Sequence, residues 1–180
     1  METVQGKSRF RSAAVWVLLF TLNVSFVLFL AGCVYSFSGS SVPKHLKTIA
    51  IPLFEDQSGF GEPNLKENFT TSLINLFIND NSLEVAERNT ADSILEGSIV
   101  SVQDAPSVIS PGGGGQVSVR RVTITVHVTF QDLKLRKKMW DKNFSNWGEY
   151  NTSGDTRATA LTDAVSKVTQ DILIETVSGW

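Results

Sequence analysis

The chain has 180 residues, 16 Lys and Arg, 18 Asp and Glu, a formal net charge of −2 and one Cys. This length is sufficient for one domain with a substantial hydrophobic core. The weakly acidic balance gives no electrostatic basis for nucleic-acid binding, so we expect no nucleic-acid partner. The single Cys excludes an intramolecular disulfide.

The amino-terminal segment has the pattern of a secretion signal or a membrane helix. Lys7, Arg9 and Arg11 form a basic start, and residues 13–30 are almost entirely apolar. A run of about 18 residues is near the lower limit for a membrane-spanning helix and is longer than the core of most signal peptides. Its length alone therefore does not decide between the two.

The end of this apolar run resembles the lipobox of bacterial lipoproteins. The sequence Leu30-Ala31-Gly32-Cys33 places two small residues before the only Cys. The resemblance implies that residues 1–32 are a signal peptide and that Cys33 becomes the acylated first residue, bound to the membrane through its acyl chains. By resemblance to the known sorting of bacterial lipoproteins, Val34 in place of Asp implies the outer membrane. An uncleaved amino-terminal anchor is the alternative.

Residues 33–46 are expected to form a lipidated tether, because the segment after Cys33 is rich in Ser and Gly. One domain is predicted over residues 47–180. It begins with the apolar run Thr48–Ile51, which ends at Pro52 and is typical of a strand buried inside a sheet. Residues 55–61 are predicted to be a loop.

A helix is predicted over residues 65–79. Asn64 is the expected cap, and Glu67 is its expected capping-box partner three residues later. Apolar residues then recur at helical spacing and are expected to face the core. They are Leu65, Phe69, Leu73, Leu76 and Phe77.

The central part of the chain has the pattern of strands. Residues 82–87 are a short candidate and Ser93–Val102 a better one, while the strict apolar and polar alternation from Val122 to Gln131 is the strongest signal. Residues 138–151 follow as its partner across a hairpin near Lys134–Lys138. Residues 103–116 are expected to be a loop.

A second helix is predicted over Thr156–Ser178, capped by Asp155 or Thr156. The predicted order is strand, helix, several strands and helix. This order indicates an α/β (α+β) fold, a two-layer sandwich in which two helices cover a mixed, mostly antiparallel sheet of about four strands. The central strands are expected to pair as an antiparallel meander.

The sequence offers no candidate catalytic site, so we expect no enzyme, no cofactor and no metal site. His45 and His127 are predicted to be ordinary surface or cross-strand residues. No cluster of His, Cys or acidic residues has metal-ligand spacing. The Gly112–Gly115 run lacks the Lys and Ser/Thr of a phosphate-binding loop and is predicted to be a loop tip.

A series of features runs through nearly the whole mature chain. The features are Cys33, Tyr35–Gly39, the segment KTIAIPLFEDQS (47–58), a helix, LEGSIVSV (95–102), VTITVHVTFQDLK (122–134), MWDKNFS (139–145) and a final helix. Their order, more than any single motif, resembles that of the LptE-type lipoproteins of lipopolysaccharide assembly. The resemblance implies a plug inside the LptD β-barrel of the outer membrane, on its periplasmic side, that assists lipopolysaccharide transport to the outer leaflet.

Basic residues at two places are candidates for contact with lipopolysaccharide phosphates or with the partner, because Lys and Arg pair well with phosphate. We hypothesise that the basic hairpin at residues 134–138 is the lipopolysaccharide-contacting site. The alternative is that they are solvated charges that protect a sheet edge from aggregation. The candidates are Arg120, Arg121, Lys134, Arg136, Lys137 and Lys138.

A second resemblance leaves another function open. The segment KTIAIPLFEDQSG (47–59) is also similar to the first strand of CsgG-type secretion lipoproteins and of lipoprotein activators of peptidoglycan synthases. This resemblance implies a secretion-channel subunit or a binding module for a periplasmic cell-wall enzyme. A CsgG-type chain is expected to form rings, so oligomeric state distinguishes it from an LptE-type plug.

Overall fold

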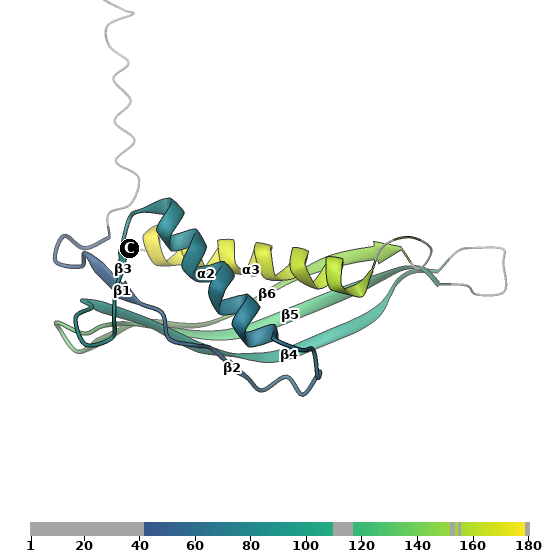
Figure 1. Ribbon diagram of the computed structural model, residues 1–180, viewed down its shortest axis with the longest axis horizontal. Coiled ribbons are helices and arrows are strands. Elements are labelled where there is room, and N and C mark those ends of the chain that lie inside the picture. Colours follow the sequence, from purple (N-terminus) through teal and green to yellow (C-terminus); the bar gives the residue numbers. More distant parts are fainter. Residues whose placement is uncertain (1–41, 110–116, 152–153, 155, 179–180) are drawn as a thin grey trace, which may run out of the picture. The chain divides into compact units, whose positions relative to one another are not determined.

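The computed structural model describes residues 42–109, 117–151, 154 and 156–178. The predicted signal peptide and Cys33 lie outside the described residues. The described part has two helices and six strands (Figure 1). In chain order they are β1 (Thr48–Ala50), β2 (Glu55–Asp56), α2 (Leu65–Asp80), β3 (Glu84–Val85), β4 (Ser93–Ile109), β5 (Val117–Asp132), β6 (Lys137–Asn151) and α3 (Arg157–Ser178).

The strands form one mixed sheet with the order β3-β1-β4-β5-β6, and β2 pairs with β4 beside this path. β1 runs parallel to both of its neighbours, while β4, β5 and β6 form the predicted antiparallel meander. The predicted α+β sandwich is confirmed, with six strands in place of about four. The additional β2 comprises two exposed residues within the predicted loop 55–61, so no apolar pattern marks it.

β4 continues seven residues beyond its predicted end at Val102, so the prediction of a loop from residue 103 was wrong. Residues 103–109 pair with residues 117–123 of β5 in an antiparallel ladder. The apolar and polar alternation typical of a strand is absent from residues 103–109, because this extension contains polar residues and Pro106, which lies at a register shift. The backbone ladder therefore extends the sheet where the side chains predict a loop.

Both helices pack on the same face of the sheet (Figure 1). The predicted first helix is confirmed, but its predicted capping box is wrong. Asn64 adopts a left-handed backbone conformation with φ 56° and makes no side-chain cap hydrogen bond. In α3, Thr156 is the cap, because its Oγ1 accepts the N–H of Thr159 at 3.2 Å.

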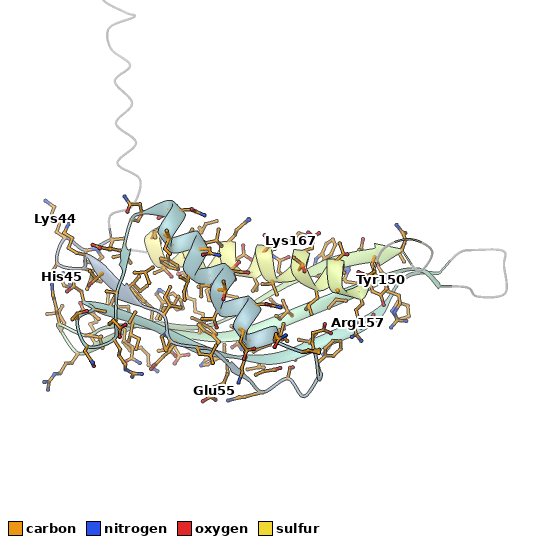
Figure 2. The ribbon with its side chains drawn as sticks, viewed as in Figure 1. Lys44, His45, Glu55, Tyr150, Arg157 and Lys167 are labelled. Atoms are coloured by element: carbon orange, nitrogen blue, oxygen red, sulfur yellow. The ribbon has the colours of Figure 1, made fainter. Side chains whose placement is uncertain are left out.

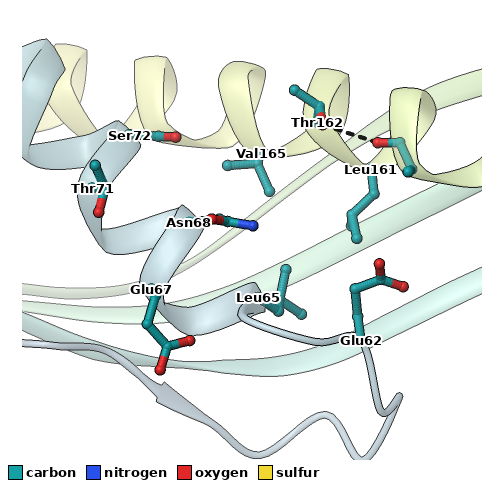
Figure 3. A pocket seen from close by; sticks show the side chains of 10 residues that line it. Glu62, Leu65, Glu67, Asn68, Thr71, Ser72, Leu161, Thr162 and Val165 are labelled. Atoms are coloured by element: carbon teal, nitrogen blue, oxygen red, sulfur yellow. Dashed lines mark hydrogen bonds between the residues drawn. The ribbon is translucent and has the colours of Figure 1, made fainter.

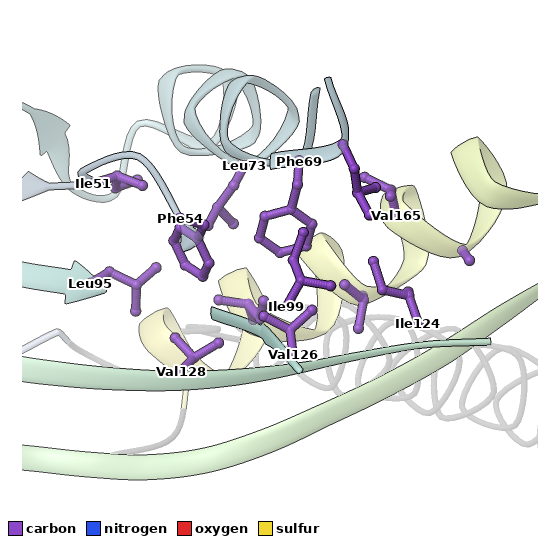
Figure 4. Packing of buried hydrophobic residues seen from close by; sticks show 14 of the residues in the cluster. Ile51, Phe54, Phe69, Leu73, Leu95, Ile99, Ile124, Val126, Val128 and Val165 are labelled. Carbon is purple, nitrogen blue, oxygen red and sulfur yellow. The ribbon is translucent and has the colours of Figure 1, made fainter. Parts of the chain in front are cut away.

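The core lies between the helices and the sheet (Figure 4). The ring centroids of Phe54 and Phe69 are 5.0 Å apart, which joins the segment after β1 to α2. Each fully buried side chain of this size contributes about 1.5–3 kcal/mol to stability. The helix-facing residues of β5 are all buried, as their alternation predicts. They are Val122, Ile124, Val126, Val128 and Phe130.

The start of the described chain belongs to this core. Leu46 is buried and Val42 packs against the core cluster. Core packing therefore begins upstream of residue 47, where we predicted the domain to start.

Candidate functional site

A polar network joins the segment before β1 to the turn between β5 and β6. Asp132, the last residue of β5, is completely buried, and His45 Nε2 donates a hydrogen bond to its Oδ2 at 2.5 Å. The other carboxylate oxygen, Oδ1, accepts the N–H of Leu135 at 2.8 Å. One buried carboxylate therefore holds both the turn and the segment that precedes β1.

Lys134 makes a second link in this network. Its Nζ lies 2.8 Å from Asp92 Oδ1 and donates a hydrogen bond to the carbonyl oxygen of His45 at 2.9 Å. The backbone N–H groups of Lys47 and Thr48 donate to Asp92 Oδ2. The Lys134 hydrogen bond lowers the pKa of Asp92; partial burial opposes this, and the two N–H groups add to it.

The pKa of Asp132 is also below its usual range. Burial acts to raise it, but the hydrogen bonds from His45 and from the N–H of Leu135 outweigh burial. Asp132 is therefore ionised near neutral pH. The turn that contains Lys134 is tied to the segment before β1 by a charged group and not only by apolar packing.

The exposed side chains of the β5–β6 turn are cationic and apolar. Arg136 has a left-handed backbone conformation with φ 52°, and the neighbouring Leu135 is 64% exposed. Lys138 pairs with Asp141 at 2.5 Å. Across the part of the chain that the structure describes, Arg136 and Lys137 have no ion-pair partner. These two cations are therefore free to meet an external anion.

Arg120 lies at the other end of β5 in a network of its own. Its Nε donates to Asp104 Oδ1 at 2.8 Å, and Tyr150 Oη donates to Oδ2 of the same carboxylate at 2.8 Å. The Asp104 hydrogen bond raises the pKa of Arg120. Asp104 on β4 therefore links Arg120 of β5 to Tyr150 of β6, and the network holds the three strands together.

Arg121 lies on the helix-free face of the sheet beside an exposed indole. Its Nη2 donates to Glu149 Oε1 at 2.8 Å, and Ser107 Oγ donates to the same oxygen. The guanidinium carbon is 4.0 Å from the ring centroid of Trp147, and Lys167 Nζ is 4.8 Å from that centroid. Trp147 remains 40% exposed. Two cations therefore flank one accessible aromatic ring.

The structure divides the six predicted contact residues into two groups. Arg120 and Arg121 lie near the start of β5, and Lys134, Arg136, Lys137 and Lys138 lie at the turn after its end. From residue 121 to residue 132 the strand is about 36 Å long, at roughly 3.3 Å per residue. Figure 2 shows His45 near one end of the sheet and Tyr150 toward the other. One small ligand group cannot contact both groups at once.

Two features of these ends were missed from the sequence. His45 was expected to be an ordinary surface residue, and its link to Asp132 spans 87 positions of the chain. An Asp directly after an alternating apolar run is a signal for a turn, and this signal marks Asp132. Trp147 was not singled out, because only the sheet register places it beside Arg121. His127 is a cross-strand residue, as predicted, with Nδ1 2.9 Å from Asn143 Oδ1.

The helix-free face between the two ends is polar, with Glu96 and Asp141 on either side of Thr129. Thr125 Oγ1 and Ser145 Oγ are hydrogen-bonded at 3.0 Å across β5 and β6. Thr123 and Thr129 lie on the same face of β5, because side chains alternate along a strand. This face presents hydroxyl and amide groups to its surroundings.

A groove of about 370 Å³ lies between α2 and α3 (Figure 3). Leu65 and Leu161 are among its apolar residues, and Asn68, Thr162 and Glu62 are among its polar ones. No group of three or more metal-ligating side chains occurs among the described residues. Neither of the two described helices is long and apolar enough to cross a membrane.

Comparison with solved structures shows the fold. A hypothetical protein of Chlamydia trachomatis, CT253, superimposes with a TM-score of 0.57 at 9% identity, covering 72% of this chain and 95% of that chain. A minor lipoprotein of Acinetobacter baumannii superimposes with a TM-score of 0.48 at 13% identity, covering 74% of this chain and 92% of that chain. A PelC variant from Paraburkholderia phytofirmans, solved as a dodecamer, also superimposes with a TM-score of 0.48 at 13% identity, covering 78% of this chain and 95% of that chain.

Comparison with curated protein sequences gives no match. Comparison with protein families gives a match to LptE, described as lipopolysaccharide-assembly, over residues 46–176. The matched segment runs from just before β1 almost to the end of α3. Because it covers most of the sequence, the chain belongs to the LptE family.

Proposed function

We propose that this chain is an outer-membrane lipoprotein that assembles with an LptD-type β-barrel, plugs it and assists lipopolysaccharide transport to the outer leaflet. The observation that carries the proposal is the family match over residues 46–176. The lipobox sequence supports acylation at Cys33 and therefore attachment at the periplasmic face of the outer membrane. The proposed role is non-enzymatic.

The anchor limits where the domain can lie. Val42 is nine positions after Cys33, and an extended chain spans at most about 3.6 Å per residue, so the reach is about 30 Å. Val42 packs against the core, which fixes this point relative to the sheet. The proposed acylation therefore keeps the His45 end of the domain within about 30 Å of the anchored leaflet.

The opposite end is the better candidate for contact with lipopolysaccharide on its way to the other leaflet. Arg121 is exposed there, and its pairs with Glu149 and Trp147 lie at the surface. Exposed ion pairs contribute little and exchange readily for other partners. A guanidinium binds phosphate oxygens in bidentate geometry. We therefore place the proposed lipopolysaccharide contact at Arg121, with Arg120 holding the strands behind it.

The helix-free face supports the proposed plug. The interiors of outer-membrane barrels are polar, so a surface that enters one must be wettable. Thr123, Thr125 and Ser145 give this face hydroxyl groups that hydrogen-bond directly or through water. We propose that this face meets the inner wall of the barrel.

A pull-down tests the proposed function. The acylated, carboxyl-terminally tagged protein is isolated from outer membranes in mild detergent, and the co-purifying chains are identified by mass spectrometry. We expect a large LptD-type β-barrel in stoichiometric amount. Recovery of rings of this chain, or of a peptidoglycan synthase, in place of a barrel would contradict the proposal and favour the CsgG-type or activator function.

A further inference from the structure

The β5–β6 turn lies directly beside the point where the described chain begins. The Lys134 side chain donates to the carbonyl oxygen of His45, and the imidazole of His45 donates to Asp132 at the end of β5. These contacts join residues 87 to 89 positions apart in the sequence. The turn therefore lies at the same end of the domain as the segment that leads to the tether.

This end carries an excess of positive charge. Six cations lie within residues 44–47 and 134–138, three carboxylates pair with residues of these segments, and Glu84 lies beside Lys47, which leaves an excess of two positive charges. The cations are Lys44, Lys47, Lys134, Arg136, Lys137 and Lys138, and the carboxylates are Asp92, Asp132 and Asp141. The excess contrasts with the net negative charge of the whole chain, −2.

The same end exposes an apolar side chain between its cations. Leu135 is 64% exposed, the largest exposed fraction among the large hydrophobic residues that the structure describes as exposed. Lys44, Leu135, Arg136 and Lys137 are all exposed and form what we call the tip patch. Cations around an exposed aliphatic side chain are the combination that binds interfacial lipid, because the cations meet headgroup phosphates and the side chain enters the acyl boundary.

We propose that the tip patch docks on the anionic phospholipid headgroups of the leaflet to which the tether is anchored. The proposal rests on the acylation of Cys33 in the proposed function. The tether limits the distance of the His45 end from that leaflet to about 30 Å, so patch and membrane meet at high effective concentration. Charge complementarity selects phosphatidylglycerol-type lipids over zwitterionic ones.

The patch is held in a defined shape before it meets the membrane. Asp132 fixes the turn through the N–H of Leu135, and Lys134 is bound to Asp92. The turn therefore loses little conformational freedom on docking. Docking through a rigid turn orients the whole domain, so Arg121 lies about 36 Å along β5 from the docked turn.

A single introduced thiol tests the proposal. Cys33 is the only Cys, and acylation removes it, so Leu135→Cys in the full acylated chain supplies the only free thiol for an environment-sensitive fluorophore. The labelled protein is reconstituted in vesicles of phosphatidylcholine alone or mixed with phosphatidylglycerol. We expect emission from an apolar environment, and quenching by lipid-bound quenchers, only with phosphatidylglycerol.

Removal of positive charge from the tip patch distinguishes docking on the lipid headgroups from mere closeness to the membrane through the anchor. In the Leu135→Cys background, Arg136→Gln with Lys137→Gln is expected to lower the ratio of lipid-contacting to water-exposed label roughly fivefold for each cation removed. Added salt is expected to lower the ratio as well, because it screens the attraction. The matched control is Ala105→Cys, an exposed position that pairs with Arg121 at the far end of the sheet. The label at position 105 is expected to remain in water in vesicles with and without phosphatidylglycerol.

Three results would overturn the proposal. They are a label at position 135 that stays in water with phosphatidylglycerol, an equal response in phosphatidylcholine alone, or a response only when lipopolysaccharide is added. The last would assign the patch to lipopolysaccharide. Flotation of the unlabelled chain with vesicles reports the acyl anchor separately. The vesicles contain no barrel, so failure here is distinct from failure of the proposed assembly with LptD.

Discussion

His45 Nε2 lies 2.5 Å from Oδ2 of Asp132, a carboxylate with no exposed surface at the end of β5. The two residues join the first described segment of the chain to the turn that carries the tip patch. Burial of a charged group is unfavourable unless hydrogen bonds compensate, and here His45 and the N–H of Leu135 provide them. The stability of this end of the domain therefore depends on Asp132 being ionised.

Asp132→Ala is expected to lower the free energy of unfolding by about 2 kcal/mol at pH 7, because hydrogen bonds to a buried charge are lost. The folded-state pKa of Asp132 is below the unfolded value, so its contribution is fully present above that value, about 3.9. The contribution is lost as the pH falls through the lower folded-state pKa. Urea unfolding at several pH values measures the difference between wild type and variant.

The exposed Asp163→Ala is the matched control and is expected to change stability by less than about 0.5 kcal/mol. Equal stability of Asp132→Ala and wild type at pH 7 would show that the network contributes nothing.

Gly148→Ala is expected to destabilise the domain by about 3 kcal/mol. Gly148 lies where β6 passes under α3, and a Cβ added there would lie 2.1 Å from the carbonyl oxygen of Ala160. The helix must move away from the strand to relieve the overlap. Thermal unfolding compares it with Gly154→Ala, where a Cβ meets nothing within 4 Å. Similar unfolding temperatures for the two variants would contradict the close packing.

Arg121→Gln is expected to reduce lipopolysaccharide capture by the purified full-length protein several-fold while leaving the unfolding transition unchanged. The reason is that its pair with Glu149 is exposed and stabilises little, whereas its guanidinium is available to phosphate. Lys142→Gln removes the same charge from an exposed pair with Glu175 and serves as the control. Equal capture by both variants would remove Arg121 from the proposed lipopolysaccharide contact.

Cys33→Ser is expected to block acylation and cleavage, so the chain retains residues 1–32. The lipobox requires the thiol as the acceptor of diacylglycerol, and a hydroxyl does not replace it. Mass spectrometry of the isolated protein measures both changes. A Cys33→Ser chain that is still cleaved before residue 33 would show that another signal directs its processing.

The helices and the central meander were predictable because their periodicities are strong. The alternation of residues 122–131 predicts the buried face of β5 correctly. The apolar stripe of residues 65–77 predicts the buried face of α2 except at Leu76, which is half-buried and lies outside the core cluster. The extension of β4 and the short β2 were not predictable, since backbone pairing creates them without an apolar pattern. The candidate cations could be identified from the sequence, but their separation to opposite ends of the sheet depends on the length of β5. The His45–Asp132 contact depends on the topology of the whole sheet.

Photo-crosslinking at Thr125 in living cells tests most directly whether this chain assembles with a barrel. Thr125 lies on the helix-free face, with Oγ1 3.0 Å from Ser145 Oγ, while Asp163 is exposed on α3, on the other side of the sheet, and serves as the control. A photoreactive amino acid at position 125, but not at 163, is expected to give an adduct with an LptD-type β-barrel. Adducts only with other copies of this chain, or none from position 125, would contradict the proposed plug.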